Sequence, residues 1–175
     1  MAEQLKNLYS KEFIEKLANK LFLIYSDFEK ENFINSIFDN TWQDLELKQR
    51  MRHIALTLNK YLPFSYDKQL EILKKVKEDF GGLEAMIFQD FVEVFGLEDF
   101  KESLKALEVF TINSSSEFAI RQFILKYENE TMNQMKLWSQ SSNEHLRRLA
   151  SEGCRPRLPW AIALPKFKQN PSKVL

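Results

Sequence analysis

The chain has 175 residues and no net charge at neutral pH, because 25 Lys and Arg balance 25 Asp and Glu. Its hydrophobic content of 44%, with 15 Phe, supplies one domain with a sizeable core and excludes a disordered chain. Only 4 Gly and 5 Pro interrupt it, which favours an all-helical protein over a sheet protein rich in turns. The single Cys154 excludes an intramolecular disulfide and suits a reducing compartment. With no signal peptide or spanning segment visible, we expect a cytoplasmic protein without a membrane partner.

The charge is unevenly distributed along the chain. From Lys136 to Leu175 eight Lys and Arg face two Glu, a balance of +6, so residues 1–135 carry −6. Such an asymmetric charge distribution suggests that one end of the molecule binds an anion such as nucleic acid. A polar solvated surface is the alternative, and charge alone does not decide between the two.

Apolar residues at helical spacing predict helices along the whole chain. Ser10 is the expected N-cap of the first helix, over residues 10–26. Its buried face is predicted to hold Phe13, Ile14, Leu17, Leu21 and Ile24. The next helices are expected over about residues 29–38, 45–61, 65–80, 84–95, 97–110, 114–127, 131–139 and 142–153, and another begins over 158–167. Short helices joined by short polar turns favour stacked antiparallel pairs over a four-helix bundle, in one domain covering residues 1–175.

Gly and Ser residues indicate where several of these helices end or begin. Gly81-Gly82 is the firmest break, and Gly96 is expected to end the helix over 84–95. Ser114 or Ser115 is the predicted cap of the helix that follows, and Thr131 that of the next.

The segment from Ser142 to Trp160 has the densest positive charge. It reads S-N-E-H-L-R-R-L-A-S-E-G-C-R-P-R-L-P-W, with four Arg and only two Glu. Ser142 or Asn143 is the expected N-cap of a short helix, and Gly153 the residue that follows its end. At about 100° per residue, one stripe of this helix holds Leu146, Leu149 and Ala150, and a flanking stripe holds His145, Arg148 and Glu152. The prolines after the helix predict an extended, stiff link that holds its arginines outward.

Two acids stand out as candidate functional groups. Glu117 lies in a helix that is apolar on nearly every face, so a buried acid there needs a reason. Its i, i+4 neighbour Arg121 offers one, and spacing alone favours that ion pair. Glu152 has the same kind of neighbour in Arg148. Further cations around Glu152 exceed what one carboxylate needs, which leaves the ion pair and a phosphate-facing site equally open.

Other chemically notable residues are expected to be structural. Trp42 and Trp138 are predicted to pack in the core, His53 to be packed or to cap a helix, and His145 to lie on a helix surface. The sequence contains neither a cluster with metal-ligand spacing nor a glycine-rich phosphate loop, so we expect no metal and no cofactor.

The Ser142 to Trp160 block resembles the signature of the AlkC-type 3-methyladenine DNA glycosylases, a family of DNA alkylation repair enzymes built of HEAT-like helical repeats. Three further segments carry the resemblance: Ser116–Arg121, Leu45–Lys48 followed by Arg52–Ala55, and Tyr61–Pro63. The resemblance covers most of residues 40–175, and the first forty match more loosely.

The resemblance implies an all-α, HEAT-like helical-repeat solenoid, an αα superhelix with a concave binding face. It implies that Glu117 and Glu152 are catalytic acids lining the lesion pocket. It further implies DNA contacts for Arg147, Arg148, Arg155, Arg157 and Trp160. The expected partner is double-stranded DNA with alkylated bases, bound by a monomer when the protein is full length. One departure is that the family carries a further pocket acid in a later repeat, whereas this chain stops at Leu175.

The implied activity is excision of cationic N-alkylated bases such as 3-methyladenine in base excision repair. Carboxylates would stabilise the positive charge that develops on the sugar as the base leaves. The alternative is a non-catalytic helical-repeat scaffold that binds DNA or a protein, or an inactive fragment of the enzyme.

Overall fold

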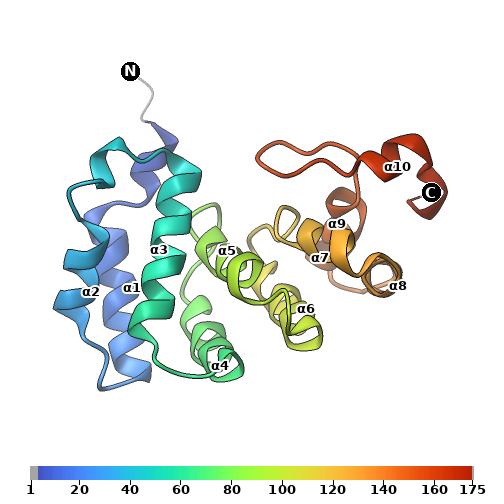
Figure 1. Cartoon of the computed structure of the whole chain (residues 1–175). Coiled ribbons are helices and arrows are strands. Elements are labelled where there is room, and N and C mark those ends of the chain that lie inside the picture. Colours follow the sequence, from blue (N-terminus) through green and yellow to red (C-terminus); the bar gives the residue numbers. More distant parts are fainter. Residues whose placement is uncertain (1–3, 175) are drawn as a thin grey trace.

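The computed structural model describes residues 4–174, which form helices with no strand among them (Figure 1). In chain order the elements are the 3-10 helix η1 (Leu5–Leu8), α1 (Lys11–Ile24), α2 (Lys30–Ile37), the 3-10 helix η2 (Trp42–Asp44), α3 (Leu47–Tyr61), α4 (Tyr66–Lys77), α5 (Met86–Phe95), α6 (Phe100–Phe110), α7 (Ile120–Lys126), α8 (Glu128–Ser139), α9 (Glu144–Gly153), α10 (Pro165–Gln169) and the 3-10 helix η3 (Pro171–Lys173). The single domain predicted over residues 1–175 stays a prediction, and its residues 1–3 and 175 lie outside the described part.

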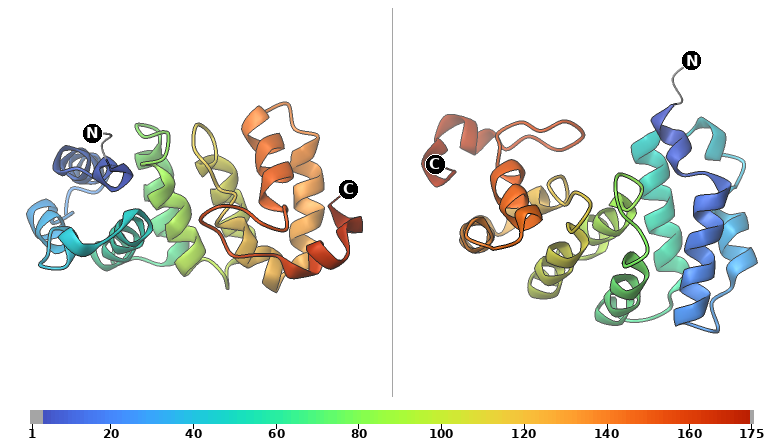
Figure 2. Two further views of the ribbon diagram at one scale, coloured as in Figure 1. Left: turned by 90° about the horizontal axis from the view of Figure 1, so that it is seen from above. Right: turned by 180° about the vertical axis from the view of Figure 1, so that it is seen from behind.

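The helices stack in succession from one end of the molecule to the other (Figures 1 and 2). α1 packs on α2 and α4, α3 on α2 and α5, and α4 on α6, so these N-terminal helices contact helices of the next pair. From α6 onward the main contacts are between helices that follow one another, α6 with α7, α7 with α8 and α8 with α9. This arrangement confirms the predicted all-α helical-repeat fold. In the described part of the chain, no helix is long and apolar enough to cross a membrane.

Local signals explain most of the N-terminal helices. The Ser10 hydroxyl accepts a hydrogen bond from the Phe13 backbone N–H at 3.2 Å, so it caps α1 as predicted. The predicted apolar face of α1 is buried except for Ile24, which is half-buried. Glu46 and Gln49 form a reciprocal capping box at the start of α3. Gly96 ends α5, as its position predicts.

The predicted start of α7 is wrong, because the expected serine caps bond elsewhere. The helix begins at Ile120, and residues 117–119 form a turn before it. The Ser114 hydroxyl donates to the Gly82 carbonyl at 2.9 Å, and the Ser115 hydroxyl donates to Glu117. The next helix, α8, also differs from prediction, since it starts at Glu128 and buries Thr131 within it.

The helix expected over residues 158–167 is mostly a loop. Only Pro165–Gln169 is helical, with Pro165 in the first turn. Pro159 has no backbone N–H to donate, and Trp160 has a φ of 61°, in the left-handed region that a helix cannot include. The loop over residues 155–164 therefore leaves α9 and reaches back toward the N-terminal helices (Figure 1).

Gly153 is the last residue of α9 rather than the residue after it, which corrects the prediction. A Cβ at this position would lie 2.9 Å from Ile120 Cγ2 and 3.0 Å from Met135 Cε. Glycine therefore permits the close approach of α9 to α7 and α8. The predicted cap at the other end is confirmed, because Asn143 Oδ1 accepts from the His145 N–H at 2.9 Å.

Candidate active site

Both predicted acids line one pocket. It has a volume of about 230 Å³ and lies between the start of α5, the turn before α7, α9 and the loop that follows α9. Its walls are formed by Leu83, Met86, Ser115, Glu117, Phe118, Arg148, Glu152, Leu158, Pro159 and Trp160. Tertiary packing thus brings together Glu117, Arg148, Glu152 and Trp160, which the sequence separates by up to 43 positions.

Glu117 is buried at the base of this arrangement, with 4% of its side chain exposed. Its Oε1 lies 3.2 Å from Nε of Arg148 on α9, and its Oε2 accepts a hydrogen bond from the Ser115 hydroxyl. A buried carboxylate needs such partners to remain charged. The Glu117–Arg121 ion pair favoured by helical spacing is therefore wrong, because the partner of Glu117 comes from a different helix.

Arg121 has a structural role that its spacing did not reveal. Its guanidinium is fully buried and donates to four backbone carbonyls. These belong to Ile162 at 2.5 Å, Arg155 at 2.7 Å, Gly153 at 3.0 Å and Pro156 at 3.3 Å. Because Arg155 and Pro156 lie on one arm of the loop after α9 and Ile162 lies on the other, Arg121 fixes the base of that loop. Burial lowers the pKa of the Arg121 guanidinium, and the nearby Cys154 opposes that shift.

Glu152 lies at the rim of the pocket, with 36% of its side chain exposed. It forms an ion pair with Arg155, three residues later, rather than with Arg148. The predicted i, i+4 partner is therefore wrong here as well. Each acid of the pocket therefore pairs with a different arginine, the buried Glu117 with Arg148 and the half-buried Glu152 with Arg155.

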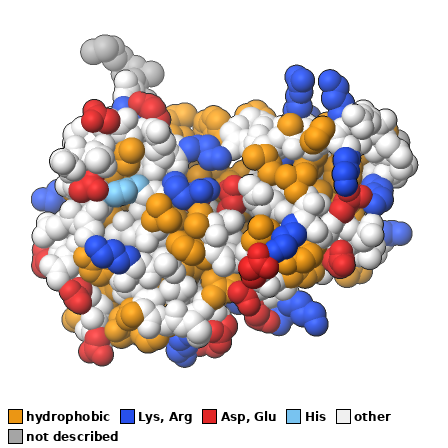
Figure 3. Space-filling model, in the orientation of Figure 1, with side chains coloured by type: hydrophobic (Ala, Val, Ile, Leu, Met, Phe, Trp, Pro, Cys, Tyr) orange, Lys and Arg blue, Asp and Glu red, His pale blue; other side chains and the backbone are white. Residues whose placement is uncertain are grey.

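The remaining predicted site residues occupy different positions. Trp160 lines the pocket and is 47% exposed. Arg157 is exposed on the loop. Arg147 lies outside the pocket lining, since its Nη1 donates to the carbonyls of Ser141 and Ser142, both at 2.8 Å. Several Lys and Arg side chains stand out on the C-terminal half of the surface, in agreement with the uneven charge of the sequence (Figure 3).

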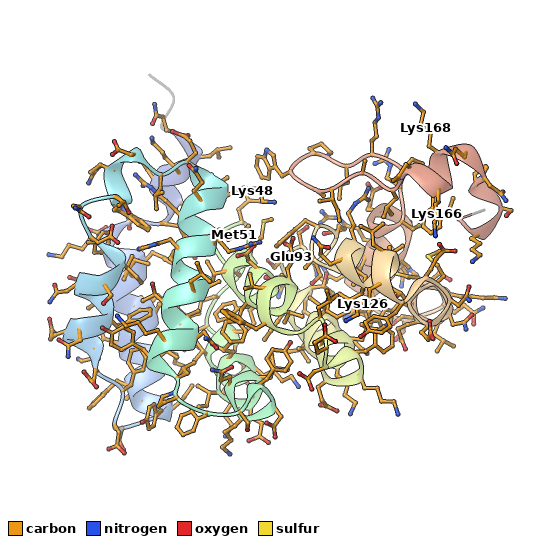
Figure 4. The ribbon with its side chains drawn as sticks, viewed as in Figure 1. Lys48, Met51, Glu93, Lys126, Lys166 and Lys168 are labelled. Carbon is orange, nitrogen blue, oxygen red and sulfur yellow. The ribbon has the colours of Figure 1, made fainter. Side chains whose placement is uncertain are left out.

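A second set of charged side chains lies on α3 and α5, and the sequence did not predict a function for it. Arg52 binds the fully buried Asp90 through two hydrogen bonds, at 2.7 and 3.0 Å. Burial, followed by the charge of Asp90, raises the pKa of the neighbouring Glu93 carboxyl. Glu93 and Lys48 lie on the side of these helices that faces the C-terminal half (Figure 4). Lys48 and Arg52 fall within the sequence segments that carry the family resemblance, but helical spacing gave no indication of what these side chains contact.

Among residues 4–174, no group of three or more His, Cys, Asp or Glu side chains is arranged to hold a metal ion. The pocket instead offers two carboxylates beside arginines and an indole ring. Such a site can bind a cationic, planar group next to an anion.

These features define a helical-repeat protein with a carboxylate pocket on one side of the stack. No family model matches the chain. It is 44% identical over 171 residues to the uncharacterized protein YhaZ of Bacillus subtilis (strain 168), covering 98% of this chain and 48% of YhaZ. A similar solved structure is the Pseudomonas fluorescens alkylpurine DNA glycosylase AlkC bound to DNA containing an abasic site analog. The two share 34% identity and a TM-score of 0.94, over 99% of this chain and 49% of the other.

Over nearly its whole length the chain is similar in sequence and structure to an AlkC-type alkylpurine DNA glycosylase. It spans about half the length of the relatives it matches.

Proposed function

We propose that the protein is a DNA glycosylase that removes cationic N-alkylated bases, such as 3-methyladenine, from double-stranded DNA in base excision repair. The observation that carries the proposal is the placement of Glu117 and Glu152 in one pocket with Trp160. The similarity to an alkylpurine DNA glycosylase bound to DNA supports it. Action on chromosomal DNA is consistent with the expected cytoplasmic location.

The pocket chemistry suits a substrate that already carries positive charge. A base alkylated at N3 leaves without being protonated, so the enzyme needs only to stabilise the charge that develops on the sugar and to position the attacking water. In the proposed reaction the glycosidic C1′–N bond breaks, its electron pair leaves with the base, and water oxygen bonds to C1′ and loses a proton. Glu117 and Glu152 supply the negative charge, and either can accept that proton.

The arginines around the acid pocket are placed where they can contact phosphates of the DNA backbone. Arg148 has 58% of its side chain exposed while its Nε faces Glu117, so its outer nitrogens remain available to a phosphate. In this proposal Arg155 and Arg157, on the loop, contact the same strand, and Arg147 contacts it from the start of α9. Trp160 stacks against the lesion or its neighbour.

Single-turnover release of 3-methyladenine from a lesion-containing duplex tests the proposal. Glu117→Gln and Glu152→Gln should each slow release on the order of 10²-fold, equivalent to roughly 3 kcal/mol, because each removes one preorganised charge. Glu144→Gln is the matched control, an exposed acid in the first turn of α9 that should leave the rate unchanged.

Melting curves recorded beside the kinetics separate chemistry from stability. If the two pocket variants lost stability but released base at the wild-type rate per folded molecule, both acids would be structural only. Duplex binding without base release by the wild-type protein would favour the non-catalytic scaffold instead.

A further inference from the structure

The loop over residues 155–164 crosses from α9 toward α3 and is held at two places. Arg121 binds its base through the four carbonyls described above. Its tip is held by Lys48 of α3, whose Nζ donates to the Trp160 carbonyl at 2.6 Å. The two residues of this second contact are 112 positions apart in the sequence. The contact therefore joins the N-terminal helices directly to the wall of the acid pocket.

The backbone at the tip is strained. Trp160 has a φ of 61°, in a region that a bulky residue rarely adopts because its side chain crowds the backbone there. Such a conformation persists only where the surroundings hold it. A charged donor bound to the carbonyl of the strained residue is a restraint of this kind, since hydrogen bonds from charged groups are roughly twice as strong as neutral ones.

Lys48 is itself held in place to make this contact. Its ammonium lies 5.4 Å from the centroid of the Phe118 ring, a cation–π distance. Phe118 is buried and lines the acid pocket next to Glu117. The same ammonium therefore touches both the fixed wall of the pocket and its loop wall.

Trp160 lines two hollows. One is the acid pocket, and the other is a hollow of about 520 Å³ lined by Gln4, Leu5, Lys6, Glu46, Leu47, Lys48 and Trp160. A displacement of the loop tip would therefore change the lining of both hollows, the acid pocket included.

We infer that Lys48 is a positioning residue that latches the loop tip to α3 and thereby holds Trp160 at the acid pocket. Lys48 acts through Trp160 and does not touch the reacting atoms. The effect of Lys48 on the reaction rate rests on the proposed glycosylase function, whereas its role in holding the loop tip does not depend on that function.

The latch is tested by fluorine NMR of the chain labelled with 5-fluorotryptophan. Trp160→Phe identifies the Trp160 resonance among those of the three tryptophans. Lys48→Met should shift and narrow that resonance, because the tip becomes mobile, and should leave the buried Trp42 and Trp138 resonances in place. Lys101→Met, which removes an exposed lysine from α6, is the control and should move none of them.

Lys48→Arg supplies a second variant that keeps a charged donor. It should restore most of the wild-type position of the Trp160 resonance, while a melting curve confirms that each variant is folded. An unchanged Trp160 resonance in folded Lys48→Met would overturn the latch.

The kinetic arm uses single-turnover base release. Lys48→Met should lower the rate constant at saturating enzyme by about tenfold or more, with duplex affinity little changed, because misplacement of a pocket wall affects the transition state more than backbone binding. Lys48→Arg should recover most of the rate. A moved resonance with an unchanged rate would refute the positioning role. If the wild-type protein released no base, the proposed function would fail, and the resonance would decide the latch alone.

Discussion

Replacing Arg121 with methionine tests whether one buried side chain holds the loop at the pocket. The change keeps a long side chain in place but removes every donor. The carbonyls of Gly153, Arg155 and Ile162 then lose this donor, whereas the Pro156 carbonyl keeps its hydrogen bond from the Leu164 N–H at 3.0 Å.

The expected loss of stability follows from two opposing contributions. A hydrogen bond from a charged donor contributes about 1.5–3 kcal/mol, whereas burial of a guanidinium costs several kcal/mol, so the net loss is well below the sum of four bonds. We expect Arg121→Met to lower the free energy of unfolding by about 3 kcal/mol. At about 2–4 °C per kcal/mol for a domain of this size, the melting temperature should fall by roughly 6–12 °C.

Thermal melting and limited trypsin digestion measure the two consequences. Cleavage after Arg157, in the loop, should become faster in the variant because the base of the loop is no longer held. Arg147→Met is the matched control: it also removes donors to backbone carbonyls, but at an exposed position, and should change stability by about 0.5 kcal/mol or less. Equal melting temperatures for the two variants, with equal cleavage, would refute the reasoning.

Three further predictions concern packing, binding and pH. Gly153→Ala should lower the free energy of unfolding by about 1–2 kcal/mol in a urea titration, because its Cβ would meet Met135 Cε at 3.0 Å; an unchanged midpoint would show that the neighbours move aside freely. Arg148→Ala should weaken duplex binding and reduce the slope of log affinity against log salt by about one unit, and an unaltered slope would remove this residue from the DNA interface. Glu93→Gln should gain stability relative to wild type as the pH rises above about 4.5, since burial and Asp90 raise the pKa of the Glu93 carboxyl. The folded state then holds its proton more tightly than the unfolded state, and stability is lost as the pH rises through the raised pKa. Melting both proteins from pH 4 to 7 checks this, and a difference that shrinks with pH would contradict it.

Local sequence signals determined the all-helical class and much of the helix layout. The Ser10 cap, the Asn143 cap and the glycine at position 96 act within one helical turn, so the sequence alone is enough to read them. The apolar stripe of Leu146, Leu149 and Ala150 is buried as its period requires. The family resemblance also came from short contiguous segments, and it named the two acids that share a pocket in the structure.

Only the tertiary structure decided which charges meet. Helical spacing offered Glu117 with Arg121, and Arg148 with Glu152, but the observed pairs are Glu117 with Arg148 and Glu152 with Arg155. An i, i+4 ion pair contributes only about 0.2–0.5 kcal/mol, whereas a buried carbonyl or carboxylate left unpaired costs about 1–3 kcal/mol or more. Burial therefore outweighs spacing, and Arg121 donates to four backbone carbonyls instead of pairing with Glu117.

The same reason explains the loop after α9. Its prolines correctly indicated a break in the helix, but nothing local indicates where an irregular segment goes or what holds it. That depends on Arg121 at its base and on Lys48 at its tip, 112 positions from Trp160. The sequence thus determined which residues are available to the site, and the stacking of the helices determined which of them face one another.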